Sequence, residues 1–324
     1  MILVTGANGL IGSFVCKELI ARAIPFKPMK RAGSDTSLLK EYDLEWLECD
    51  ILDTTNLERI LVGVTGVIHC AAMVSYHKQD EYLMYRTNVK GTRNLVNCCI
   101  NVGVKYLLHL SSVAALGRKA ESREVDENTH WSESPLNSAY ARTKYLSELE
   151  VWRGEQEGLE VCVMNPSVVI APGDGQRSSS KLLKYVWDQK RFYTSGSINF
   201  VDVRDVAKLV VDAYEKKVTG ERFVVSADSI KYKDLFGRLA FKMKKKTPSI
   251  KAGPTLIKIV YVLDQIKFFV TRIRPTVTKE MLKSASSNIV FMNQKSKDYF
   301  SFNYRSIDDT VTWACEEFEL QMKR

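Results

Sequence analysis

The stretch Thr5-Gly6-Ala7-Asn8-Gly9-Leu10-Ile11-Gly12 decides the fold of this 324-residue chain. It follows the apolar run of residues 1–4 and opens a helix-like stretch, residues 10–23, so the local order is strand, glycine turn and helix. The N-terminus of a helix placed in this way directs free N–H groups at a phosphate. By itself a glycine triplet also fits a plain strand-to-helix turn, so residues elsewhere in the chain are needed to identify a phosphate-binding loop.

The three glycines serve different needs. Gly6 permits a tight turn, Gly9 lets the backbone approach a pyrophosphate, and Gly12 lets the helix pack closely on the strand. This spacing after a threonine resembles the cofactor loop of the extended short-chain dehydrogenases/reductases, the NAD-dependent epimerase/dehydratase superfamily. The resemblance implies that Asn8, Leu10 and Ile11 join the glycines in binding the cofactor.

The same resemblance implies an α/β fold, a Rossmann-type doubly wound parallel sheet with a smaller C-terminal substrate lobe. We expect residues 1–170 to form the dinucleotide-binding domain, with residues 198–217 returning to it. Residues 171–324 should then form mainly the substrate lobe. A chain of 324 residues with 45% hydrophobic residues is long and apolar enough for this arrangement.

Composition narrows the other possibilities. No charged and apolar leader precedes the first strand, which favours a cytoplasmic protein. The odd number of cysteines, seven, and their lack of metal-ligand spacing predict reduced, buried thiols and no metal site. The net charge of +9 comes from basic residues that look scattered, with no nucleic-acid-binding motif, and an anionic cofactor accounts for part of it.

Two basic residues follow the expected second strand, residues 25–29. NAD-selective sites place an acidic residue here, about twenty residues past the glycine turn, whereas a basic residue accommodates a 2′-phosphate. Lys30, Arg31 and Ser34 therefore favour NADP(H). Asp35 lies slightly too far along the chain for the acidic role, so NAD(H) is the alternative. A solvated strand end is the other interpretation of these two basic residues.

Two later segments resemble cofactor contacts of the family. A third strand at 44–47 leads to Asp50 and Ile51, which are similar to the adenine-contacting segment, although an aspartate here also suits a cap for a helix at 54–61. A fourth strand, 66–70, leads to Ala71 and Ala72, whose small side chains let the dinucleotide pass close to the backbone. His69 in that strand is interpreted as packed rather than catalytic.

A serine and a Tyr-x-x-x-Lys motif form the candidate catalytic group. Residues 104–110 predict a strand that delivers Ser112 to the carboxyl edge of the sheet, where open parallel sheets bind ligands. Tyr140 and Lys144 stand at i and i+4, on one helix face and about 6 Å apart along the axis. An ammonium near a phenol favours the phenolate and lowers its pKa from about 10. A surface pair is the alternative interpretation of this motif alone.

The order of these residues resembles the family. There the helix that begins at Asn88 and ends at Gly103 stands behind the active site, so Asn88 is a fourth candidate, with an ordinary buried asparagine as the alternative. Alignment with the strand end of the family selects Ser112 rather than Ser111. Pro166 and Ser167, after a strand at 160–164, resemble the segment that borders the nicotinamide.

The stretch from Ser111 to Gly117 is nearest to the dihydroflavonol 4-reductase and 3β-hydroxysteroid dehydrogenase-like branch. Dehydratases of nucleotide sugars carry Asp-Glu after the catalytic threonine, whereas this chain has Val113-Ala114, which argues against a 4,6-dehydratase. The family often dimerises through a four-helix bundle that includes the helix of Tyr140, so a homodimer is a possibility.

The C-terminal third is less informative. The cluster at 242–246 is interpreted as a solvated helix end. The apolar residues of 254–274 are interrupted by charged residues, which argues against a helix that spans a membrane. The two alternatives are an amphipathic helix that covers the pocket and a peripheral contact with a membrane. The charged residues at 202–205 are expected to tie the lobe to the core.

Three functions remain in view. The leading hypothesis is an NADP(H)-dependent oxidoreductase that transfers a hydride between nicotinamide and a small-molecule ketone, aldehyde or secondary alcohol by a Ser-Tyr-Lys mechanism. The alternative is a nucleotide-sugar epimerase with tightly bound NAD, in which basic residues at 181, 184, 190 and 191 hold a diphosphate. The third is a cofactor-sensing protein without turnover, which the presence of both Tyr140 and Lys144 disfavours.

Overall fold

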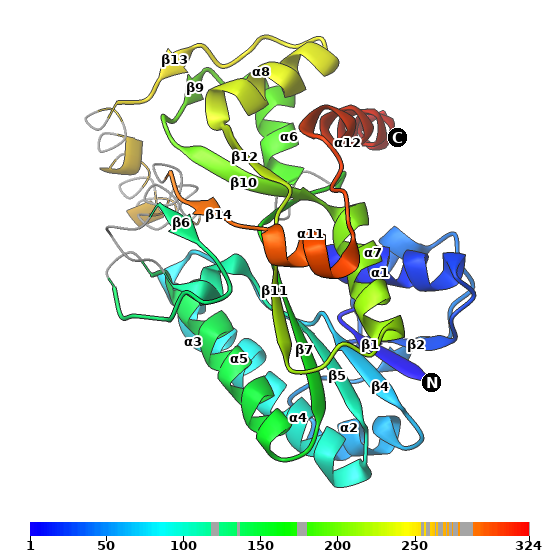
Figure 1. Ribbon diagram of the computed structural model, residues 1–324. Coiled ribbons are helices and arrows are strands. Elements are labelled where there is room, and N and C mark those ends of the chain that lie inside the picture. Colours follow the sequence, from blue (N-terminus) through cyan, green and yellow to red (C-terminus); the bar gives the residue numbers. More distant parts are fainter. Residues whose placement is uncertain are drawn as a thin grey trace.

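A seven-stranded parallel sheet organises the molecule (Figure 1). The computed structural model describes residues 1–117, 123–134, 137–173, 180–253 and 288–323, together with isolated residues between 254 and 287. The strand order is β11-β7-β5-β4-β1-β2-β3, so the direction of winding reverses between β1 and β4. This confirms the predicted Rossmann-type α/β fold. The strands are β1 (Ile2–Thr5), β2 (Phe26–Lys30), β3 (Leu47–Glu48), β4 (Gly66–His69), β5 (Tyr106–Leu110), β7 (Glu160–Pro166) and β11 (Glu221–Val225).

Helices cover both faces of this sheet, because the side chains on each face of the strands are mostly apolar and buried. Val67 and Ile68, adjacent in β4, belong to two different apolar clusters, since successive side chains of a strand point to opposite faces. The cluster of Ile68 includes α1 (Leu10–Ala21) and α7 (Val203–Glu215). The cluster of Val67 includes α2 (Thr54–Leu61), α4 (Gly91–Val102) and α5 (Ala139–Gln156).

Most expected elements are present, with two differences. The third strand was expected at 44–47, but β3 comprises only Leu47–Glu48, because this edge strand pairs with β2 at just those two positions. The helix expected from Asn88 begins earlier: α3 (Glu81–Met84) runs into a π-helix, η3 (Tyr85–Lys90), before α4 starts. Gly103 ends α4 in the left-handed conformation, as expected of a C-cap.

The smaller lobe has its own sheet and core. Its three strands, in the order β12-β10-β8, are β8 (Val168–Ile170), β10 (Ser197–Asp202) and β12 (Asp228–Lys231). Helices α6 (Ser180–Trp187), α8 (Tyr232–Lys242) and α12 (Ile307–Met322) pack there in one apolar cluster. Two short parallel pairs form separate sheets, β9 (Phe192–Tyr193) with β13 (Ile250–Lys251) and β6 (Glu124–Val125) with β14 (Val290–Phe291). Helix α11 (Gln294–Phe300) packs on the large domain, because Phe300 belongs to the cluster of Ile68.

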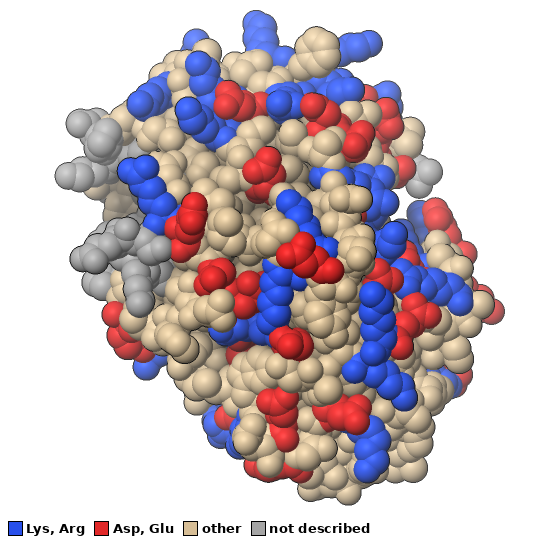
Figure 2. Space-filling view, in the orientation of Figure 1, with Lys and Arg blue, Asp and Glu red and all other residues tan. Residues whose placement is uncertain are grey.

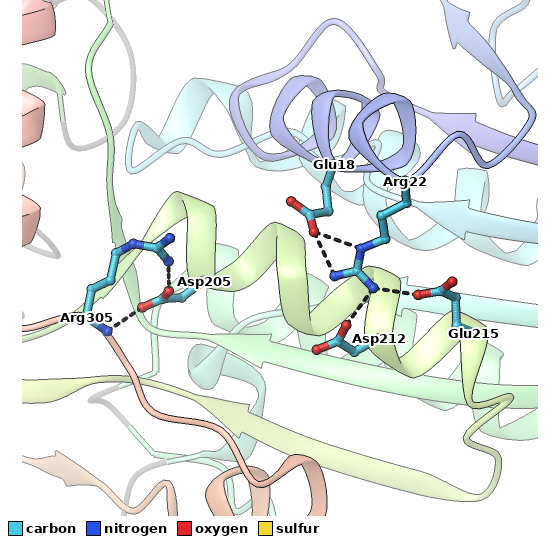
Figure 3. A network of polar contacts seen from close by, with 6 residues as sticks. All are labelled: Glu18, Arg22, Asp205, Asp212, Glu215 and Arg305. Carbon is cyan, nitrogen blue, oxygen red and sulfur yellow. Dashed lines mark hydrogen bonds and ion pairs between the residues drawn. The ribbon is translucent and has the colours of Figure 1, made fainter.

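After β10 the chain runs back to the large sheet through α7 and β11. β10 belongs to the small sheet, whereas α7 packs on the large sheet and β11 forms its edge. Ionic contacts fix α7 (Figure 3): Arg22 of α1 binds Glu18, Asp212 and Glu215, and Arg305 binds the buried Asp205. Asp205 therefore ties the C-terminal segment to the core, as the sequence predicts.

All seven cysteines are free thiols. Six are buried and Cys70 is half-buried, which confirms the prediction of reduced, packed cysteines. Within the part of the chain that the structure describes, we find no helix that is both long and apolar enough to cross a membrane. Most of residues 254–274, for which an amphipathic helix was expected, lie outside the described residues.

Candidate active site

The glycine loop is shaped by contacts that leave no room for side chains. Gly6 has φ +62°, and a Cβ there would lie 2.7 Å from the backbone of Ala71. A Cβ on Gly12 would lie only 2.2 Å from the carbonyl oxygen of Gly6. Gly9 precedes the first turn of α1, where a Cβ would meet only the Gly6 carbonyl oxygen, at 3.2 Å. The loop therefore presents bare backbone at the start of a helix, the arrangement that receives a pyrophosphate.

A polar cavity of about 960 Å³ adjoins this loop at the ends of β2 and β3. It is lined by Asn8, Arg31, Ala32, Gly33, Ser34, Asp35, Glu48, Cys49, Asp50 and Asn56. Arg31 is exposed and has no acidic partner among the described residues, whereas Lys30 is ion-paired with Glu48. The Asp35 carboxylate accepts hydrogen bonds from the backbone and hydroxyl of Ser37. Arg31 is thus the cation best placed to meet an anion in this cavity.

Asp50, the predicted adenine acceptor, is not the cap of the next helix. Its carboxylate accepts a hydrogen bond from the backbone N–H of Leu52, at 2.9 Å, while Asp53 caps α2 through the N–H of Asn56. The neighbouring Ile51 is buried against Gly91 of α4, where a Cβ would lie 2.3 Å from Ile51 Cδ1. Asp50 therefore lines the cavity and Ile51 packs beneath it.

The structure brings Ser112, Tyr140 and Lys144 together. Ser112 follows β5 and Tyr140 stands in the first turn of α5, and the Ser112 hydroxyl lies near enough to the phenol to lower its pKa. Ser138 caps this helix by accepting a hydrogen bond from the N–H of Ala141. Lys144, only 2% exposed, donates to the carbonyl oxygen of Leu110 over 2.8 Å. Two hydroxyls and an ammonium therefore converge at the carboxyl edge of the sheet.

The electrostatics of this group differ from the expectation in one respect. Desolvation raises the pKa of Tyr140 well above that of an ordinary phenol, and Tyr76 adds to this, although the neighbouring hydroxyl of Ser112 opposes it. The prediction that Lys144 lowers this pKa is wrong here, because desolvation dominates and the ammonium is bound to a backbone carbonyl. Desolvation also lowers the pKa of Lys144 to about 8, against the opposing effects of Glu148 and Cys70. At neutral pH the tyrosine is thus a phenol beside an ammonium.

Asn88 lies in the π-helix and holds the loop after β4 to the helix of Tyr140. Its side chain accepts from the N–H of Met73, at 2.7 Å, and donates to the Met73 carbonyl oxygen and to the Thr143 hydroxyl. Thr143 in turn donates to the carbonyl oxygen of Tyr140. Asn88 therefore positions the backbone around the site, and π-turns of this kind are frequent at functional sites.

A buried carboxylate behind Lys144 was not predicted from the sequence. Glu148, only 1% exposed, accepts a hydrogen bond from the Asn165 side chain at 2.6 Å and is ion-paired with Arg222 at 3.3 Å. The same Asn165 amide donates to the carbonyl oxygen of Ser112. Its only sequence signal was the four-residue spacing from Lys144, which puts Glu148 on the same helix face as Tyr140 and Lys144.

The segments expected to border the nicotinamide offer polar groups and small residues. Ser167 follows β7, beside the end of β5, and its buried hydroxyl has no hydrogen-bond partner within the described part of the chain; the same holds for Ser111. Ala71 and Ala72 follow β4, with Ala71 half-buried and Ala72 exposed, and Pro166 ends β7. Buried hydroxyls without a protein partner suit a ligand amide, so these residues fit a nicotinamide.

The two histidines nearest the site are structural. His69 is fully buried, with its ring nitrogens hydrogen-bonded to the hydroxyls of Thr5 and Thr92, at 2.7 and 3.0 Å. Burial, with a smaller contribution from Lys144, lowers its pKa to about 3. Burial likewise lowers the pKa of His109. Both rings are therefore neutral, and the interpretation of His69 as a packed residue is confirmed.

Comparison with known proteins agrees with this geometry. The sequence profile described as the NAD dependent epimerase/dehydratase family matches residues 2–226, and the chain belongs to that family. This membership, with relatives named as reductases and dehydrogenases, makes the protein an NAD(P)-dependent oxidoreductase of the extended short-chain type.

Three similar proteins illustrate the range. The chain is 29% identical over 323 residues to a putative dihydroflavonol 4-reductase of Synechocystis, covering 98% of this chain and 94% of that one. It is 32% identical over 230 residues to sterol demethylase protein B of Methylococcus capsulatus, covering 70% and 69%. The crystal structure of a protein designated gox2253 superposes with a TM-score of 0.84 at 30% identity, covering 99% and 98%. The dihydroflavonol reductase-like assignment is confirmed.

Proposed function

We propose that this protein is an NADP(H)-dependent reductase of small-molecule aldehydes or ketones that acts through Ser112, Tyr140 and Lys144. The observation that carries the proposal is the placement of two neighbouring hydroxyls, Ser112 after β5 and Tyr140 in α5, one helical turn from the buried ammonium of Lys144. A carbonyl oxygen between the two hydroxyls would be polarised by one and protonated by the other. Relatives named as reductases support the same chemistry.

The protonation states favour the reductive direction. The raised pKa keeps Tyr140 protonated at neutral pH, so it is ready to give a proton to the substrate oxygen. The reduced nicotinamide, when bound, supplies the hydride to the carbonyl carbon. Lys144, with a pKa of about 8, is mainly an ammonium at pH 7 and would stabilise the tyrosinate that remains. Ser112, which caps a short 3₁₀ turn, holds the substrate oxygen in place.

The preference for NADP(H) is part of the proposal and rests on Arg31. The guanidinium, which has no acidic partner in the described part of the chain, lines the cavity next to the glycine loop, and Ser34 lies in the same turn. Lys30 contributes less, because Glu48 neutralises it. A guanidinium binds phosphate through paired N–H donors, which suits the 2′-phosphate.

The epimerase alternative is less well supported. The UDP-glucose 4-epimerase of Thermotoga maritima has the same fold, with a TM-score of 0.80 over 99% of each chain, but at 20% identity the likeness concerns the fold alone. Of the basic residues proposed to hold a diphosphate, Lys184 is ion-paired with Asp188. Lys190 and Arg191 directly precede β9 in the chain, and Arg191 is bound through its carbonyl oxygen to β13.

Identification of the retained dinucleotide separates the two functions. The purified protein is denatured, the released nucleotides are identified, and carbonyl compounds and UDP-sugars are then screened with NADPH. We expect little retained NAD and measurable NADPH oxidation with an aldehyde or ketone. Stoichiometric bound NAD, with interconversion of a UDP-sugar and no net change in cofactor, would establish the epimerase instead.

A further inference from the structure

The excess positive charge of the protein is concentrated in one short segment. Residues 231–251 contain eight lysines and arginines but a single acidic residue, Asp234, so this segment has a net charge of +7 in a chain of net charge +9. The interpretation of the basic residues as scattered is therefore wrong. The segment comprises α8, the turn after it and β13.

The fold brings further basic residues to the same place. β13 pairs in parallel with β9, and the N–H groups of Ser249 and Ile250 donate to the carbonyl oxygen of Arg191. Lys190 and Arg191, some fifty residues earlier in the chain, thus lie beside β13. Figure 1 shows α8, β9 and β13 together at one end of the molecule, and lysine and arginine side chains gather at that end in Figure 2.

Several of these charges are free to meet a partner. Arg238 is ion-paired with Asp308, and Lys245 lies over the ring of Trp187 at 4.2 Å. In contrast, Lys244, Lys246 and Lys251 are exposed and have no acidic partner among the described residues. These three ammonium groups are hydrated point charges on flexible stems.

Large apolar side chains are exposed among the lysines. Phe241, the penultimate residue of α8, is 82% exposed, while Phe192 and Ile250 are 38% and 39% exposed. Phe192 and Ile250 are direct partners in the β9–β13 pair, so they lie next to each other. Phenylalanine and isoleucine usually lie inside a protein, so exposed apolar residues within a basic surface indicate a partner that is both anionic and apolar.

We propose that this end of the small lobe docks on the surface of an anionic phospholipid bilayer. The docking surface consists of Phe192, Phe241, Lys244, Lys246, Ile250 and Lys251. The apolar side chains would enter the boundary between headgroups and acyl chains, while the lysines keep their ammonium groups at the lipid phosphates. The phosphates of a nucleic acid could pair with the lysines but would leave the apolar side chain of Ile250 without a contact. A bilayer has both phosphates and acyl chains, so it matches this surface better.

The proposal is tested by sedimentation of the full-length protein with two kinds of vesicle, phosphatidylcholine alone and phosphatidylcholine mixed with phosphatidylglycerol. We expect binding to the mixed vesicles that weakens as salt is added. Because each lysine near an anionic surface contributes about fivefold to binding, the triple variant K244E/K246E/K251E should lose at least ~100-fold. Phe241→Ser should lose about tenfold in the same vesicles, since it removes apolar burial.

A matched variant controls for total charge. K40E/K105E/K217E makes the same change in net charge at exposed lysines elsewhere and should bind the mixed vesicles nearly as the unchanged protein does. Circular dichroism verifies that both variants are folded. Equal losses in the two triple variants, equal binding to neutral vesicles, or binding of an RNA oligonucleotide without binding of vesicles would each overturn the proposal.

Discussion

Replacing Glu148 by glutamine should move the alkaline limit of activity to lower pH. Glu148 lies one turn after Lys144 on α5, and its charge supports the ammonium against desolvation, which leaves the pKa of Lys144 at about 8. Glutamine keeps an oxygen that can accept the hydrogen bond from Asn165 but removes the charge. The variant therefore tests electrostatics with little change of shape.

The size of the effect follows from the spacing. Two unit charges about 6 Å apart interact by roughly 3 kcal/mol at an effective dielectric constant of ~20, or about two pKa units as an upper bound. Arg222, which loses its carboxylate partner in the variant, acts in the same direction. The ammonium form is needed, so activity falls as pH rises through the pKa of Lys144. We expect this fall near pH 8 in the unchanged enzyme and about one to two units lower in the variant.

The assay is kcat/KM against pH with NADPH and the best carbonyl substrate from the screen. Glu150→Gln is the matched control, because Glu150 lies on the same helix but is ion-paired with Arg93 and Arg153. An alkaline limit that stays in place in Glu148→Gln, or that moves equally in the control, would refute the reasoning.

Two further predictions concern the cofactor loop and cavity. Arg31→Ala should weaken NADPH binding by roughly ten- to hundredfold and leave NADH binding nearly unchanged, since a charge-assisted contact contributes about 1.5–3 kcal/mol. Titration of the protein with both cofactors checks this. Equal losses of affinity for the two cofactors would show that Arg31 does not contact the 2′-phosphate. Gly12→Ala should destabilise the fold by about 1–3 kcal/mol, because its Cβ would overlap the Gly6 carbonyl oxygen. Gly237→Ala, at a helical position with open space around the Cβ, should be neutral or slightly stabilising in the same thermal unfolding experiment.

Local patterns in the sequence were enough to predict the sheet and the placement of Ser112, Tyr140 and Lys144 near its carboxyl edge. The glycine loop and the Tyr140–Lys144 spacing act over a few residues, and strands such as β5 are continuous apolar runs. The short β3 was less predictable, because an edge strand is limited by its neighbour rather than by its own residues.

Features that depend on contacts between distant residues were missed. The network of Glu148 joins residues that lie 17 and 74 positions away in the chain, which no local pattern reveals. The direction of the pKa shift of Tyr140 was also wrong, because the sequence predicts the nearby ammonium but not the extent of desolvation. The pairing of β9 with β13 brings the basic residues Lys190 and Arg191 next to the basic segment 231–251, and composition alone does not show this.

The most direct test of the account compares the unchanged protein with Tyr140→Phe in NADPH oxidation and in NADPH binding. The phenol hydroxyl transfers only a proton, so we predict a rate reduced about 10²–10⁴-fold with cofactor affinity preserved. Lys144→Ala should instead damage both, because the family resemblance implies that this lysine also holds the nicotinamide ribose. A Tyr140→Phe enzyme that keeps most of its rate would contradict the central claim that Tyr140 is the proton donor.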